Sequence, residues 1–303
     1  MKRNQLGNSK LKVSEIGLGT MSLGTDRSKA ISLIHEAIDN GVTFIDTADL
    51  YEFGLNEEIV GEALRDRRDS VVLATKAGNH FEQGKEGWYW DPSKKHIKAA
   101  LKDSLKRLKT NHIDLFQLHG GTIEDPIDET IEAFEELKEE GLISEYGISS
   151  IRPNVIREYV KKSSIASVMM QYSILDRRPE EEMLDLLHDN NISVIARGPL
   201  AKGMLTDQYS DKVREDGFLD YSKFDVIETV NQLSEIKGDQ RNLTQTALRY
   251  ALAHPAVATV IPGASRREQL LANLTAQHAP DLTREEIQNI QAVSKMNVYD
   301  KHR

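Results

Sequence analysis

The chain has 303 residues, of which 39% are hydrophobic and 29% are charged, and its formal net charge is −9 at pH 7. This composition is typical of a globular chain with a large core, and the negative charge disfavours nucleic acid as a partner. The sequence contains no cysteine, which excludes disulfides, thiolate metal sites and a thiol nucleophile, and we expect no metal site.

The N-terminal residues are basic but lack the apolar run of about 7–15 residues that a secretory signal requires. No run of about 18 apolar residues occurs either, so we expect a cytoplasmic location and no membrane partner. The segment "NQLGNSKLKV" has Gly-Asn-Ser at its centre, which predicts a short β-hairpin ahead of the main fold.

Apolar runs rich in β-branched residues then alternate with amphipathic stretches along the chain, which is typical of successive βα units. The predicted strands cover residues 15–19, 43–47, 71–75, 113–119, 145–149, 167–171, 192–196 and 257–261. Helical segments between them include 29–40, 94–109, 128–141 and 179–191.

Eight short, doubly buried strands favour a closed parallel (β/α)8 TIM barrel formed by residues 1–303 as a single α/β domain. The competing fold is an open doubly wound sheet. Against it, the first strand is followed by "GLGTMSLGTDRS", which lacks a G-x-G-x-x-G motif leading directly into a helix. Two long irregular loops are predicted after strands three and seven, at residues 77–93 and 202–240.

Four ionisable side chains lie at or just after the ends of neighbouring predicted strands. Asp46 ends the second strand, Tyr51 follows in its loop, Lys76 comes directly after the third strand, and His119 ends the fourth. Taken alone, each of these residues could have a purely structural role in a turn, in the core or on the surface. However, a lysine and a histidine directly after apolar strands would be costly to bury without partners.

These residue types together suit the protonation of a developing alkoxide. An ammonium beside a phenol stabilises the phenolate form, so Lys76 is expected to make Tyr51 acidic enough to act as the general acid. Asp46 is expected to keep Lys76 charged, and His119 to hydrogen-bond a carbonyl oxygen. If an acid protonates the carbonyl oxygen, the carbonyl carbon has to receive a hydride. Proteins obtain a hydride from a cofactor.

The chain resembles the aldo-keto reductase superfamily, in particular its bacterial, potassium-channel β-subunit-like branch. The resemblance rests on "FIDTADLYEFGLNEEIVGEAL", "VLATKAG", "SLKRLKTNHIDLFQLH", "QYSILDR", "GPLAKGML" and "IPGASRREQLLANL", which occur in the family's order. It implies an NADP(H)-dependent barrel enzyme that reduces aldehyde or ketone carbonyls to alcohols, with Asp46, Tyr51, Lys76 and His119 as the catalytic residues.

The resemblance also implies a set of cofactor-binding residues. Arg266, beside a serine at a helix start, favours NADPH over NADH, and it is chosen ahead of Arg267 for the 2′-phosphate. The complete implied set is Gly19, Thr20, Met21, Asp46, Ser149, Gln171, Arg197, Gly198, Leu200, Lys202, Gly203, Gly263, Ser265, Arg266, Gln269 and Asn273.

Two departures from the family pattern concern the nicotinamide and the substrate. Arg197 stands where many members place an aromatic ring, and its planar guanidinium can also stack. After His119, "GGT" replaces a bulkier aromatic-proline pair, which leaves the pocket wall open. Trp88 and Trp90 either fill that space or pack within their own loop.

Two other functions remain open at this point. Lys76 could form a Schiff base, as in an aldolase, although the apparent adenosine-phosphate loop would then have no purpose. Alternatively, the chain is an NADPH-binding sensor or accessory subunit with little turnover. The sequence does not decide the carbonyl substrate, the direction of reaction or the oligomeric state.

Overall fold

Eight parallel strands form the central sheet of the computed structural model, which describes residues 1–82, 85 and 87–303. Each strand pairs with the next in chain order, and each overlaps one of the eight predicted runs. Bridges from Ile16 to Val260 and from Gly19 to Gly263 connect the last strand with the first. The strands are β3 (Leu18–Gly19), β4 (Phe44–Asp46), β5 (Val72–Ala77), β8 (Ile113–Leu118), β9 (Ile143–Ser149), β10 (Ser167–Gln171), β11 (Ser193–Arg197) and β12 (Val257–Ile261).

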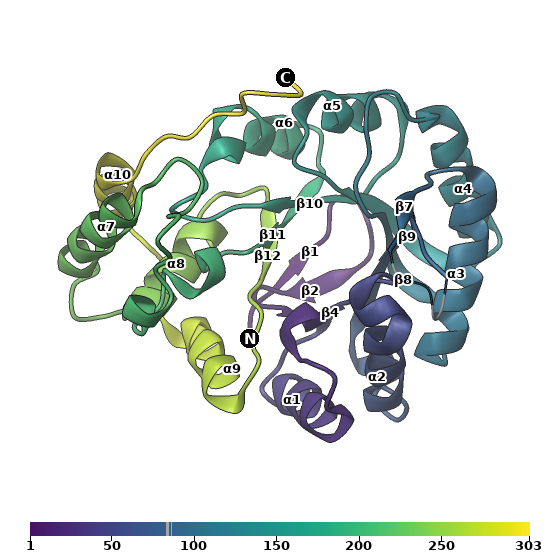
Figure 1. Cartoon of the computed structure of the whole chain (residues 1–303), viewed down its shortest axis with the longest axis horizontal. Coiled ribbons are helices and arrows are strands. Elements are labelled where there is room, and N and C mark those ends of the chain that lie inside the picture. The colour runs from purple at the N-terminus through teal and green to yellow at the C-terminus, as the bar shows by residue number, and fades with distance from the viewer. Residues whose placement is uncertain (83–84, 86) are drawn as a thin grey trace.

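This arrangement confirms the predicted (β/α)8 barrel, and Figure 1 shows the helices arranged around its strands. Among the described residues, no helix is both long and apolar enough to cross a membrane. The helices are α1 (Arg27–Asp39), α2 (Leu55–Ala63), α3 (Lys94–Leu108), α4 (Ile127–Glu139), α5 (Pro153–Lys162), α6 (Met183–Asp189), α7 (Lys223–Ile236), α8 (Leu243–Leu252), α9 (Arg267–Leu274) and α10 (Arg284–Val293).

Helix α4 illustrates why these segments are helical and cover the barrel. Its buried residues Ile127, Ile131, Phe134 and Leu137 recur at intervals of three and four, which places them on one face. The ring of Phe134 stacks on that of Tyr146 in β9 at 5.2 Å. The apolar face therefore packs on the sheet.

The predicted hairpin ahead of the barrel is present, and it covers the end of the barrel at which the strands begin. β1 (Arg3–Gln5) pairs antiparallel with β2 (Lys12–Ser14). The Asn4 side chain donates a hydrogen bond to the carbonyl oxygen of Ala258 at 2.8 Å. Leu6 and Val13, both 0% exposed, join the core cluster inside the barrel, so this end is filled and the opposite end carries the open mouth.

Both predicted long loops contain regular structure. Within residues 77–93, β6 (Asn79–His80) pairs antiparallel with β7 (Tyr89–Trp90). The interpretation of residues 202–240 as irregular was wrong, because they contain the 14-residue helix α7. Its start is fixed by a capping box in which the Ser222 side chain accepts from the Asp225 amide and the Asp225 side chain accepts from the Ser222 amide.

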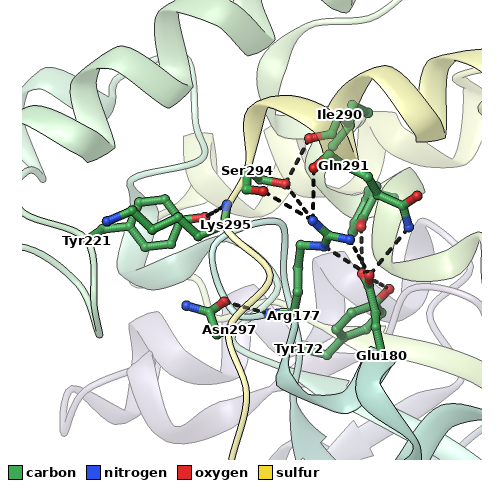
Figure 2. A network of polar contacts seen from close by, with 10 residues as sticks. Tyr172, Arg177, Glu180, Tyr221, Ile290, Gln291, Ser294, Lys295 and Asn297 are labelled. Atoms are coloured by element: carbon green, nitrogen blue, oxygen red, sulfur yellow. Dashed lines mark hydrogen bonds and ion pairs between the residues drawn. The ribbon is translucent and has the colours of Figure 1, made fainter.

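The segment after α10 is anchored to the loop that follows β10. Figure 2 shows Arg177, 6% exposed, at the centre of the contacts. Its guanidinium donates to the carbonyl oxygens of Gln291 and Ser294 at 3.0 and 3.2 Å and pairs with Glu180 at 2.8 Å. Its backbone amide donates to the Asn297 side chain, so the C-terminal segment is held beside the barrel mouth.

Candidate active site

Neighbouring strands bring the four predicted catalytic side chains together at the barrel mouth. Asp46 is the last residue of β4, and Tyr51 begins a short 3-10 helix, Tyr51–Gly54, that precedes α2. Lys76 lies in β5, and His119 follows β8. All four line the same cavity, so the sequence-based grouping of these residues corresponds to one place in the structure.

Lys76 is at the centre of this group and is 1% exposed. Its ammonium donates to Asp46 Oδ2 at 2.7 Å, to the Thr47 carbonyl oxygen at 2.8 Å and to Tyr51 Oη at 3.2 Å. Burial disfavours the ammonium, but the Asp46 carboxylate and Tyr51 outweigh burial and raise the pKa of Lys76. Lys76 is therefore a fixed positive charge in contact with the phenol.

His119 is held as a neutral imidazole. Its ring lies edge-on to the ring of Tyr51, with centroids 5.8 Å apart. Burial, followed by the charges of Lys76 and Arg197, lowers the pKa of His119 to about 3. A neutral ring cannot compete with Tyr51 as the acid at neutral pH, but its N–H can donate a hydrogen bond to an oxygen.

Two buried polar atoms of this group face no hydrogen-bond partner among the described residues. They are Oδ1 of Asp46 and Nδ1 of His119. Buried polar atoms are normally satisfied, so each unpaired atom here indicates a place for a ligand or water.

The cavity has a volume of about 980 Å³ and extends from the four catalytic candidates to the start of α9. Thr20 and Gln171 do not line it. Thr20 is buried and donates to the Asp46 carbonyl oxygen and to Asn56, whereas Gln171 contacts Asp176 and Arg197. The predicted cofactor residues that do line the cavity are Gly19, Met21, Asp46, Ser149, Arg197, Gly198, Leu200, Lys202, Gly203, Gly263, Ser265, Arg266, Gln269 and Asn273.

The two arginines at the start of α9 differ in their surroundings. Arg266 lines the cavity and donates to the Gln208 side chain at 3.0 Å. Arg267 pairs instead with Glu36 of α1 at 2.6 Å. Among the residues that the structure describes, no side chain caps the N-terminus of α9, so its first amide groups are available to an anion beside Arg266.

Sequence reasoning missed several polar residues of the cavity wall. Arg152 lies two residues after Ser150, and Gln208 and Lys212 come from the long segment before α7. Gln208 and Lys212 line the cavity because of how this long segment folds, and a segment of this length gives no strong local signal. Arg152 is the N-cap residue of α5, and no sequence motif marked it as a site residue. The two tryptophans named from the sequence, Trp88 and Trp90, also line it.

The chain is similar to known proteins over the region that contains these residues. A family model described as the aldo/keto reductase family matches residues 15–295, a range that includes all four catalytic candidates. The chain is 57% identical to the uncharacterized oxidoreductase YqkF of Bacillus subtilis (strain 168), with 100% of both chains covered.

The chain is also similar to a more distant relative and to a solved structure. The NADH-specific methylglyoxal reductase of Escherichia coli (strain K12) is 32% identical, covering 91% of this chain and 93% of that protein. The holo form of aldo-keto reductase AKR11C1 from Bacillus halodurans superimposes with a TM-score of 0.94 at 56% identity, covering 100% of this chain and 99% of that one.

Proposed function

The chain belongs to the aldo/keto reductase family, and from this premise we propose that it reduces aldehyde and ketone carbonyls to alcohols with NADPH as the hydride donor. The observation that carries the proposal is the contact series from Asp46 through Lys76 to Tyr51 on the wall of the cavity. A buried charge that touches a phenol at a pocket is an arrangement for proton transfer.

In this mechanism the Tyr51 hydroxyl donates its proton to the carbonyl oxygen of the substrate. The Lys76 ammonium, 3.2 Å from that hydroxyl, stabilises the phenolate that remains. Asp46 keeps Lys76 charged and directed at Tyr51, since their 2.7 Å contact is buried. His119, a neutral donor beside Tyr51, orients the carbonyl oxygen.

The residues of the cavity fit a nicotinamide dinucleotide. The unpaired Oδ1 of Asp46 can accept a hydrogen bond from a ribose hydroxyl at one end. Lys202 and Arg266 line the cavity farther along and can neutralise phosphates, together with the uncapped amides of α9. When bound, the cofactor supplies the hydride that reduces the carbonyl carbon.

The preference for NADPH over NADH is proposed on the basis of Arg266. Its guanidinium is not paired with a carboxylate in the described contacts and lines the cavity near Ser265. Such a group suits a 2′-phosphate, which NADH lacks. One relative at 32% identity carries the name of an NADH-specific enzyme, so the two cofactors have to be compared directly.

The experiment is to measure NADPH and NADH consumption by the purified protein across a panel of aldehydes and ketones. We expect multiple turnovers of NADPH with at least one reactive aldehyde, and a higher kcat/KM with NADPH than with NADH. A protein that binds NADPH tightly but completes no turnover would contradict the reductase proposal and favour an accessory role. Equal kcat/KM with both cofactors would contradict only the cofactor preference.

A further inference from the structure

The pocket wall beside His119 is formed by Trp90, which comes from a different part of the chain. Gly120 directly follows His119, and its φ of +139° is one that residues with side chains rarely adopt. A Cβ atom at Gly120 would lie 3.3 Å from Cζ3 of Trp90, and one at Gly78 would lie 2.7 Å from the same atom. The indole therefore packs directly on the backbone of two glycines.

The polar edge of the same indole is also fixed. Nε1 of Trp90 donates to both carboxylate oxygens of Asp125 at 3.0 Å. Asp125 in turn accepts from the backbone amide and the hydroxyl of Thr122, at 2.7 and 2.8 Å. Because its ring and its N–H are both held, the indole has one orientation at the cavity.

The hairpin that carries Trp90 is tied to its neighbours. Trp90 in β7 pairs with Asn79 in β6. His80 of β6 stacks on His96 of α3, with ring centroids 4.6 Å apart and planes 14° apart, and it contacts Asp91 at 3.3 Å. The ligand atoms of His80, Asp91 and His96 lie within 4.8 Å of one another, and the stacking of the two histidine rings joins the hairpin to α3.

We propose that Trp90 determines substrate specificity as the apolar wall beside the reacting carbonyl, and that Asp125 is the positioning residue that fixes its indole. The inference rests on the proposed reductase function and adds a substrate class. A flat indole next to His119 accepts carbonyl compounds with a slender or planar apolar substituent. It excludes compounds that are branched next to the carbonyl, because the ring already packs on the backbone of two glycines and has no room to move toward them.

A fluorescence titration tests this contact without requiring turnover. The chain has two tryptophans, so Trp88→Phe leaves Trp90 as the only indole and Trp90→Phe leaves Trp88. We expect 4-nitrobenzaldehyde, added with and without NADP+, to quench the Trp90 emission saturably, and to quench the emission of Trp88, which also lines the cavity but is 54% exposed, to a smaller extent. Equal quenching of both, or none at Trp90, would overturn the assignment even if the protein reduced aldehydes well.

Substrate selectivity gives the second measurement. For Trp90→Ala we expect kcat/KM to fall about tenfold with benzaldehyde and to rise with branched 2,2-dimethylpropanal, while propanal changes little. Trp90→Phe should restore most of the preference for benzaldehyde. Parallel losses on all three aldehydes, with a lowered Tm, would indicate a structural role only and would overturn the proposal.

If Asp125 acts by holding the indole N–H of Trp90, substitutions of Asp125 should matter only when that N–H is present. Asp125→Asn keeps an acceptor oxygen, so we expect it to retain the wild-type ratio of kcat/KM for benzaldehyde over 2,2-dimethylpropanal, whereas Asp125→Ala lowers that ratio. In the Trp90→Phe background, which has no N–H to hold, Asp125→Ala should leave the ratio unchanged. A similar loss in both backgrounds would contradict a positioning role for Asp125.

Discussion

Lys76 and His119 line the same cavity, yet the structure holds one charged and the other neutral. Lys76 is buried against a carboxylate and two other oxygens, and the Asp46 carboxylate raises its pKa. His119 has no carboxylate partner in the described part of the chain, and burial, followed by the charges of Lys76 and Arg197, lowers its pKa to about 3. The two opposite shifts separate the roles of charge stabilisation and hydrogen-bond donation.

The neutral state of His119 predicts how the stability of the free protein depends on pH. Its pKa in the folded protein, about 3, lies below the ordinary value of 6.5. The unfolded chain therefore binds the proton first, and stability is lost as the pH falls from about 6.5 toward 3. At pH 5 the loss from this residue is about 2 kcal/mol of unfolding free energy.

Urea unfolding of the wild type and His119→Gln at pH 7.5 and pH 5 measures this difference. We expect the wild type to lose about 2 kcal/mol more than the variant over this interval. The variant serves as the control for all other titrating groups. An equal loss in both proteins would show that His119 is not held neutral by the fold.

The start of α9 explains why two adjacent arginines have different partners. Arg267 is the first residue of the helix and pairs with Glu36 on α1, which covers the same side of the barrel. Arg266 is the N-cap residue with extended backbone and lines the cavity. The turn into the helix therefore directs one cation to a neighbouring helix and the other to the pocket.

This difference predicts unequal effects of two matched substitutions. We expect Arg266→Ala to weaken NADPH binding by about tenfold or more, because a charge-assisted contact is lost, and to leave NADH binding nearly unchanged. Arg267→Ala should have little effect on either cofactor. Dissociation constants from fluorescence titration give the comparison, and a larger NADPH effect in Arg267→Ala would reverse our assignment.

The sequence predicted the strands and the catalytic residues better than the loops. Runs of β-branched apolar residues marked every barrel strand, and strand ends meet at one mouth in any parallel barrel, which brought Asp46, Tyr51, Lys76 and His119 together. Helix α7 was missed although Ser222 and Asp225 form a readable capping box. The position of Trp90 depends on packing between distant segments, which local patterns do not specify.

A buried ion pair between Glu15 and Arg249 lies where the last strand of the barrel meets the first. The Glu15 backbone carbonyl accepts from the Val260 amide at 3.0 Å, next to the bridges that connect β12 with the first strand. The side chain of Glu15, a residue that is 3% exposed, contacts Nη1 and Nη2 of Arg249 in α8 at 3.0 and 3.2 Å. The ion pair therefore links the junction between the first and last strands of the barrel to helix α8.

Removing one member of this pair is expected to destabilise the fold strongly. Arg249→Met leaves the Glu15 carboxylate buried without its partner, which should cost about 3–5 kcal/mol of unfolding free energy. Lys106→Met breaks an exposed contact with Asp103 and should cost less than about 1 kcal/mol. Urea denaturation compares the two, and similar small losses would contradict a structural role for the buried pair.

Tyr51 is the proposed proton donor in carbonyl reduction. Its hydroxyl contacts Lys76 at 3.2 Å, and Tyr51→Phe removes that hydroxyl while keeping the ring. This role is tested by measuring the turnover of NADPH with the best aldehyde, together with the affinity for NADPH, for the wild type and for Tyr51→Phe. We expect kcat to fall about 100-fold or more while the affinity for NADPH is preserved; a variant that retains wild-type turnover would show that Tyr51 is not the proton donor.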